Sequence, residues 1–142
     1  MNFSTDCSIP AGATPVAECT YGFGVTDVHM FVATALILEG VGVSAFLGAA
    51  ADIMSKDYLT DAGSILTVES RYSSYLCSAL KEAPFAQPFD TPLTIDEVYT
   101  LAAAFIISCP SSNPKLLVNA FPALTLDLTS PMLVKTGTSS PS

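Results

Sequence analysis

The chain has 142 residues, of which 50% are hydrophobic and 13% are charged, and its net charge is −8. This length predicts one domain that is large enough to bury a core. Thirteen Asp and Glu against five Lys and Arg leave no basic patch that could neutralise phosphates, so nucleic acid is excluded as a partner. The charged share is about half of the usual one, which predicts that the fold hides some apolar surface against a partner.

The cysteines indicate the redox compartment in which the protein folds. They stand at positions 7, 19, 77 and 109, without Cys-x-x-Cys spacing, and the lone His29 is not near them in sequence, so a zinc site has little support. An even number of cysteines in a weakly charged chain favours disulfides and a secreted protein. Residues 1–10 lack the basic and apolar regions of a signal peptide, so we expect none there.

The first expected helix spans about residues 27–54 and follows a Pro- and Gly-containing loop at 1–24. Thr26 is its predicted N-cap, with Asp27 in the first turn. Between residues 30 and 51 the only charge is Glu39, so the segment is long and apolar enough to cross a bilayer. The central acid and the absence of flanking Lys/Arg clusters favour the central helix of a bundle over a membrane span.

A break at Lys56-Asp57 and an amphipathic stretch predict a second helix over about 58–81, which forms an antiparallel hairpin with the first. Prolines keep 84–92 out of helix. The sequence Thr94-Ile95-Asp96-Glu97 fits a capping box that starts a third helix over about 94–108.

The remainder is expected to be irregular. Residues 116–128 form an apolar, irregular or short-strand segment that wraps the helices, and 129–142 form a Ser/Thr/Pro-rich tail. The predicted architecture is therefore all-α, with one domain at 1–128 and a tail.

Two carboxylates lie on apolar faces of the hairpin. Glu39 shares a helix stripe with Val32, Leu36 and Val43, and Glu69 lies among apolar residues of the second helix. Buried carboxylates require partners. One interpretation is a metal site; the other is a proton shared between the two acids, or hydrogen bonds to Tyr72 and nearby hydroxyl groups.

Several long stretches resemble a family of secreted fungal ferritin-like proteins. They are AGATPVAECTYGFGVTD (11–27), LEGVGVSAFLGAA (38–50), AGSILTVESRYSSYL (62–76), PFDTPLTIDEVYTLAAAFIISCPSSNP (88–114) and AFPALTL (120–126). This resemblance spans nearly the whole chain and implies a fold derived from a four-helix bundle. It also implies a disulfide between Cys19 and Cys109, which leaves Cys7 and Cys77 to pair with each other or Cys77 as a buried thiol.

The resemblance also implies a reduced metal site. A complete ferritin-like bundle supplies one Glu from each of two helices and Glu-x-x-His from each of the other two. Glu39 takes the place of a single Glu, and Glu69-Ser70-Arg71-Tyr72 takes the place of one Glu-x-x-His, with Tyr72 where His is expected. The other helix pair and its ligands are not in this sequence, which begins in the loop that would follow them.

The expected function is accordingly a non-enzymatic, secreted structural or interaction protein on a degenerate ferritin-like scaffold, with no cofactor. The alternatives are a carboxylate protein that binds iron or another divalent metal once a dimer or partner chain completes the site, and a binder of small apolar ligands. The expected partner is a second copy or another helical chain. His29 is expected on the surface.

Overall fold

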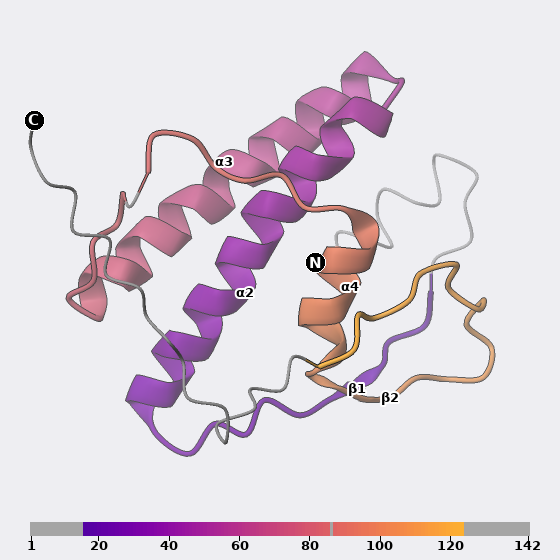
Figure 1. Ribbon diagram of the computed structural model, residues 1–142, viewed down its shortest axis with the longest axis horizontal. Coiled ribbons are helices and arrows are strands. Elements are labelled where there is room, and N and C mark those ends of the chain that lie inside the picture. Colours follow the sequence, from indigo (N-terminus) through magenta and orange to yellow (C-terminus); the bar gives the residue numbers. More distant parts are fainter. Residues whose placement is uncertain (1–15, 86, 124–142) are drawn as a thin grey trace, which may run out of the picture.

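The computed structural model describes residues 16–85 and 87–123 (Figure 1). The elements in chain order are β1 Thr20–Tyr21, α2 Val28–Ala49, the 3-10 helix η1 Ala50–Asp52, α3 Lys56–Ala79, α4 Ile95–Ala103 and β2 Ile106–Ser108. Helices α2 and α3 form a long hairpin, α4 packs beside α2, and β1 and β2 form a small two-stranded sheet. The predicted all-α hairpin with a third helix is confirmed.

The starts of both long helices differ from the sequence prediction. Asp27, not Thr26, is the N-cap of α2, because its extended backbone lets Oδ1 accept a hydrogen bond from the Met30 amide at 2.9 Å. Ser55 caps α3 through Oγ, which accepts from the Tyr58 amide at 3.4 Å. Helix α3 therefore begins at Lys56, and the expected break at Lys56-Asp57 is wrong. The chain turns at 53–55 instead.

The core of the hairpin is thin. Among the described residues, only Val43 of α2 and Ala62 of α3 are buried hydrophobic residues, at 4% and 8% exposure. Gly42, beside Val43, brings α2 close to α3. Most side chains of the two helices are only half-buried or exposed, so the hairpin leaves much apolar surface uncovered.

The connection from α3 to α4 crosses the near face of the hairpin in Figure 1 and is held against α2 by its backbone. The Leu93 amide donates a hydrogen bond to the Ser44 carbonyl at 3.1 Å. The Leu93 carbonyl in turn lies directly against Gly48, where a Cβ would collide with it. The two contacts fix the position from which α4 starts.

Helix α4 has the expected capping box but is shorter than the expected 94–108. Glu97 Oε2 accepts from the Thr94 amide at 2.7 Å, and Thr94 Oγ1 accepts from the Glu97 amide at 3.4 Å. The helix ends at Ala103, and the segment Ile106–Ser108 pairs antiparallel with β1. Consecutive β-branched isoleucines favour extended backbone, and β1 provides the partner strand.

The segment after β2 is irregular as far as it is described. Two amides tie it to α4: that of Asn119 donates to Asp96 Oδ1 at 3.1 Å, and that of Phe121 donates to Thr100 Oγ1 at 2.9 Å. The expected irregular wrap is therefore observed up to residue 123. Its last part, the domain limit at 128 and the tail at 129–142 lie outside the described residues.

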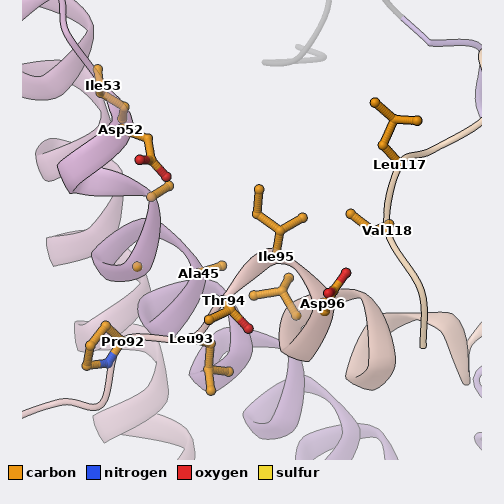
Figure 2. Close-up of a pocket in the computed structure, with 13 residues that line it drawn as sticks. Ala45, Asp52, Ile53, Pro92, Leu93, Thr94, Ile95, Asp96, Leu117 and Val118 are labelled. Atoms are coloured by element: carbon orange, nitrogen blue, oxygen red, sulfur yellow. The ribbon is translucent and has the colours of Figure 1, made fainter. Parts of the chain in front are cut away.

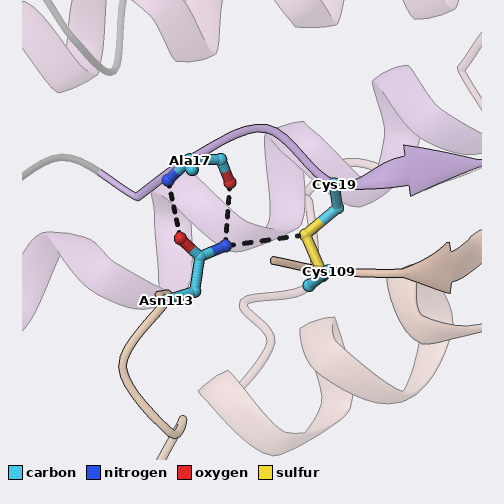
Figure 3. Close-up of a disulfide and its surroundings, with 4 residues drawn as sticks. All are labelled: Ala17, Cys19, Cys109 and Asn113. Carbon is cyan, nitrogen blue, oxygen red and sulfur yellow. Dashed lines mark hydrogen bonds between the residues drawn. A yellow bond between two sulfur atoms is a disulfide. The ribbon is translucent and has the colours of Figure 1, made fainter. Parts of the chain in front are cut away.

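A disulfide joins Cys19, before β1, to Cys109, after β2, with Cα atoms 4.2 Å apart, which confirms the expected pair (Figure 3). Asn113 reinforces it: its Oδ1 accepts from the Ala17 amide at 2.7 Å, and its Nδ2 donates to the Ala17 carbonyl at 2.8 Å. The side-chain amide thus ties the segment before β1 to the segment after β2. Cys77 has no disulfide partner among the described residues, and Cys7 lies outside them, so a bond between these two cysteines stays a prediction.

The close approach at Gly48 gives a first prediction. Gly48→Ala should destabilise the fold by about 1–3 kcal/mol, because the new methyl group meets a backbone carbonyl that cannot rotate away. Gly40→Ala in the same helix is the matched control, since nothing lies within 4 Å of its Cβ position. That control should stabilise by about 0.5–1 kcal/mol. Urea denaturation measures both, and equal effects of the two substitutions would contradict the packing described.

The disulfide gives a second prediction. It closes a sequence separation of 90 residues. The chain-entropy model then gives about 4.6 kcal/mol of stabilisation. Cys19→Ser with Cys109→Ser should lower the free energy of unfolding by that order, whereas Cys77→Ser should have a much smaller effect. If the double substitution left the midpoint of unfolding unchanged, the disulfide would not hold the two ends of the fold together.

Candidate functional site

The two carboxylates singled out in the sequence lie near each other between α2 and α3, close enough for the charge of Glu39 to act on Glu69. Glu39 lies in the middle of α2, and Glu69 extends from α3 towards Gly42, one turn further along α2. A methyl group at Gly42 would collide with Glu69 Oε2 and come within 2.6 Å of its Cδ. Gly42 therefore makes the space for the carboxylate. This role of Gly42 could not be predicted from the sequence, because it depends on which α3 side chain lies opposite the glycine.

Burial dominates the electrostatics of this pair. Glu69 Oε2 has no accessible surface and no hydrogen-bond partner among the described residues. Burial raises the pKa of Glu69, and the negative charge of Glu39 raises it further. Burial also raises the pKa of Glu39. The hairpin thus holds two acids that resist ionisation, and the hydroxyl partners considered for Glu69 do not reach its Oε2.

Tyr72 stands one turn after Glu69 on α3 and is 55% exposed. It is on the same side of the helix as Glu69 but is not enclosed with the carboxylates. His29 is exposed in the first turn of α2, as expected. The structure thus brings Glu39 and Glu69 together and leaves the phenol of Tyr72 at the surface.

The donor set does not by itself match a ferritin-like di-metal centre. Among residues 16–85 and 87–123, no group of three or more His, Cys, Asp or Glu could hold a metal ion. Two carboxylates without an imidazole supply only part of the ligand set that a di-iron bundle uses. Any ion at this point would need further ligands from outside the hairpin.

One side of the hairpin is uncovered around the carboxylates. On α2 it comprises Phe31, Ala35, Leu38 and Gly42, and it ends before Ala45 and Ala49, which line a groove between α2 and α4. Helix α3 contributes a parallel strip of Asp61, Ile65, Val68, Tyr72, Tyr75 and Ala79. We call this surface the open face. Its large side chains protrude, with Phe31 60% and Tyr75 75% exposed.

The opposite side of the hairpin is covered by the loop after α3. A cavity of about 460 Å³ there is lined by α2, α3 and loop residues, including Gly40, Ser44, Ser70 and Ser74. These four stand two positions after Leu38, Gly42, Val68 and Tyr72, which places them about 200° around their helices. The loop therefore cannot cover the open face.

Helix α2 and the short helix η1 together form a segment that resembles a membrane-spanning helix in length and composition. The segment Val28–Asp52 has a mean hydropathy of 2.0 and is long and apolar enough to cross a bilayer by length and composition alone. The core helix of a soluble bundle passes the same test. Helix α2 is contacted along one side by α3 and at its end by α4, but little of it is buried in the described fold, whereas the core helix of a soluble protein is mostly buried.

A second hollow lies between the end of α2 and the start of α4 (Figure 2). This groove has a volume of about 800 Å³. Its walls are mostly apolar, with Ile53, Ile95 and Leu117 around its mouth and the carboxylates of Asp52 and Asp96 on opposite sides. Leu117 is 98% exposed, so the groove is open to solvent.

Comparison with known proteins agrees with this architecture. A family model described as a ferritin-like domain matches residues 5–82, more than half of the chain and the whole of the α2–α3 hairpin. The chain belongs to the ferritin-like family. No curated protein matches it.

The raised pKa of Glu69 gives a third prediction. The folded state binds the proton of this carboxyl more tightly than the unfolded state does, so its contribution is most favourable below its ordinary pKa of 4.5. That contribution is lost as the pH rises through the raised pKa. The free energy of unfolding of the parent protein should therefore fall between pH 4.5 and pH 7. It should fall less in Glu69→Gln, because this side chain cannot ionise.

Glu97→Gln is the control with the opposite sign. Hydrogen bonds from the backbone and side chain of Thr94 lower the pKa of Glu97, so its contribution is present above the ordinary pKa and is lost as the pH falls. This variant should lose stability at pH 7 and approach the parent protein in acid. Parallel stability–pH curves for the parent and Glu69→Gln would show that Glu69 is not desolvated.

Proposed function

We propose that the protein is a non-enzymatic, secreted interaction module built on the ferritin-like scaffold, and that its open face docks against a second helical surface. The observation that carries the proposal is the combination of two long helices with an uncovered apolar side. In such a hairpin the exposed Phe31, Leu38, Tyr72 and Tyr75 form one patch with the small residues between them. Contiguous apolar patches of several hundred Å² mark interaction sites.

The size of the open face supports this function. On α3 the face runs from Asp61 to Ala79, so it is roughly 27 Å long, and two packed helices make it about 20 Å wide. Its flat area of roughly 500 Å² is of the size of apolar patches that mark interaction sites, and is below the ~800 Å² that each partner contributes to a standard interface. A helical partner is favoured because a groove between two helices accepts the ridge of a third helix.

The chemistry of the chain supports a non-enzymatic role. The single histidine, His29, is ten residues from Glu39 along α2, which is about 15 Å. It therefore cannot act with the carboxylate pair as an acid–base system. The disulfide between Cys19 and Cys109 supports secretion, since such bonds persist in oxidising compartments.

The proposal is tested by placing a charge in the open face. Leu38→Glu should weaken association and change the binding of a hydrophobic dye, because a carboxylate cannot be buried there without a partner. Asp57→Asn is a control at an exposed position in the first turn of α3. Light scattering and dye fluorescence on the purified protein are the measurements. A parent protein that is monomeric at micromolar concentration and binds no dye would exclude a docking function.

A second candidate function is binding of iron or another divalent cation in a completed assembly. The observation that favours it is Glu69 Oε2, a carboxylate oxygen without solvent or a hydrogen-bond partner, beside a second acid. Such a pair can ligate a hard cation if a docked chain supplies the remaining ligands. Metal analysis of the natively purified protein, with Glu69→Gln as the comparison, distinguishes this function from docking alone.

The degenerate ligand set gives a fourth prediction. Tyr72→His should not create stoichiometric iron binding in a monomer, because it adds one imidazole to two carboxylates and no other described residue completes the larger ligand set of a ferritin-like di-metal centre. Iron titration followed by absorbance, with Tyr75→His as the matched control one turn away, measures the effect. Tight binding by monomeric Tyr72→His alone would show that the hairpin already holds a sufficient site.

The groove beside α4 supports a third candidate, a binder of small apolar ligands. Its volume of about 800 Å³ lies within the range of small-molecule sites, and its lining is mostly apolar. A ligand that copurifies with the protein and protects Leu117 and Ile95 from solvent would favour this function over docking.

A further inference from the structure

We infer that the cavity beneath the loop after α3 binds a small neutral sugar, held by serine hydroxyl groups and by one exposed aromatic ring. The cavity has a volume of about 460 Å³, which lies within the range of small-molecule sites. It is on the side of the hairpin opposite the open face. The inference therefore does not rest on the proposed docking function.

Four serine residues line the helical walls of this cavity, which we call the serine cavity: Ser44 from α2 and Ser70, Ser73 and Ser74 from α3. Earlier in α3, the hydroxyl groups of Thr60, Ser64 and Thr67 each donate to a backbone carbonyl three or four positions before them, at 2.7–2.8 Å. The hydroxyl groups of the four cavity serines form no hydrogen bond with any described residue. They are also accessible, since Glu69 Oε2 is the only enclosed side-chain oxygen or nitrogen without a partner in the described parts of the chain.

The α3 wall of the serine cavity is polar although a loop covers it. Ser70, Ser73 and Ser74 are half-buried and stand at steps of three and four positions, so they share one side of the helix. Apolar residues on this side would allow the loop to pack closely, whereas the serines border an open space. Half-buried hydroxyl groups require hydrogen-bonding partners, and here these partners come from molecules inside the cavity.

The loop contributes groups of a different kind to the serine cavity. The ring of Phe85 lines it and is 80% exposed, so most of the ring is available for contact with a ligand. The Gln87 side chain donates through Nε2 to Thr91 Oγ1 at 3.4 Å, which leaves its carbonyl oxygen as an acceptor. Asp90 adds a carboxylate acceptor. The cavity thus combines hydroxyl groups, two further acceptors and an aromatic ring.

This combination matches a neutral sugar. The hydroxyl groups of a sugar donate and accept, as do those of the serines, and they can also donate to the two acceptors of the loop. The C–H face of a pyranose ring carries a weak positive potential, which suits the negative face of the Phe85 ring. A linear polyol has the hydroxyl groups but no such face.

The charges of the serine cavity disfavour other ligands. Among the described residues, no Lys, Arg or His lines it, and the net charge of the chain is −8, so anions such as phosphorylated sugars are repelled. Asp90 is the one carboxylate in the described lining, and no described group of three or more His, Cys, Asp or Glu could hold a metal ion.

The first experiment measures binding. Saturation-transfer NMR on the full chain should detect at least one of four neutral sugars: D-glucose, D-mannose, D-galactose and N-acetyl-D-glucosamine. Sorbitol should bind about 5-fold more weakly, because it lacks the flat face, and the 6-phosphate of the bound sugar should also bind more weakly. Failure of all four sugars would show that the cavity holds only water and would overturn the inference. Equal binding of sorbitol would overturn the choice of a ring sugar.

The second experiment changes the lining. Ser70→Ala with Ser74→Ala should weaken binding by about 5-fold or more, as expected for the loss of at least one hydrogen bond. Ser64→Ala is the matched control, since its hydroxyl group is outside the cavity and already donates to the Asp61 carbonyl. An unchanged affinity of the double variant would show that the serines do not hold the sugar.

Gly40→Leu fills the cavity without a clash, because Gly40 lines it and nothing lies within 4 Å of its Cβ position. This variant should keep its helical circular dichroism and lose detectable sugar binding. Equal affinity in the parent protein and Gly40→Leu would place the sugar elsewhere and overturn the inference.

The thiol of Cys77 gives a local measurement, because this residue also lines the serine cavity. In a Cys7→Ser background, alkylation of Cys77 by iodoacetamide is followed by peptide mass spectrometry. With the sugar at about ten times its dissociation constant, the rate should fall by about 10-fold, since about a tenth of the protein is then unoccupied. Binding by NMR with an unchanged alkylation rate would show that the sugar lies outside the serine cavity.

Discussion

The structure depends on how closely other segments can approach α2. Two glycines on different sides of this helix permit contacts that no other residue would allow. Gly42 accepts the Glu69 carboxylate from α3, and Gly48 accepts the Leu93 carbonyl from the start of α4. Since α3 and α4 have few contacts apart from those with α2, these two points set the arrangement of all three helices. Both contacts require a glycine in α2, one against a side-chain carboxylate and the other against a backbone carbonyl.

The close approach at Gly42 also makes the ionised form of Glu69 unfavourable. A carboxylate that fills the space at Gly42 loses its water, and a second acid nearby makes ionisation harder still. A stability argument alone would replace such a pair by apolar residues. The pair is therefore explained by the close packing of Glu69 against Gly42 and not by a gain in stability.

Much of this fold could be predicted from the sequence because its signals are local. The apolar run of α2, the stripe of α3 and the Thr94–Glu97 capping box each depend on residues within a few positions, and the hairpin follows from the short turn. The end of α4 could not be predicted in this way. Residues 104–108 continue an apolar pattern that is compatible with a helix. Ile106 is in a strand because it pairs with Tyr21, which is distant in the sequence. The proximity of Glu39 and Glu69 could be predicted, because both lie on the apolar faces of their helices. The exposure of Tyr72 could not, because it depends on which side of the hairpin the rest of the chain covers.

The disulfide joins two segments that together enclose nearly the whole described fold, from before α2 to after α4. The chain between them is thus a covalent ring, closed next to the small sheet. A protease that cuts the exposed connection between α3 and α4 would open this ring without releasing either piece. Such a nicked protein would keep its mass and separate into fragments only after reduction, so damage in an oxidising compartment would not by itself disperse the domain.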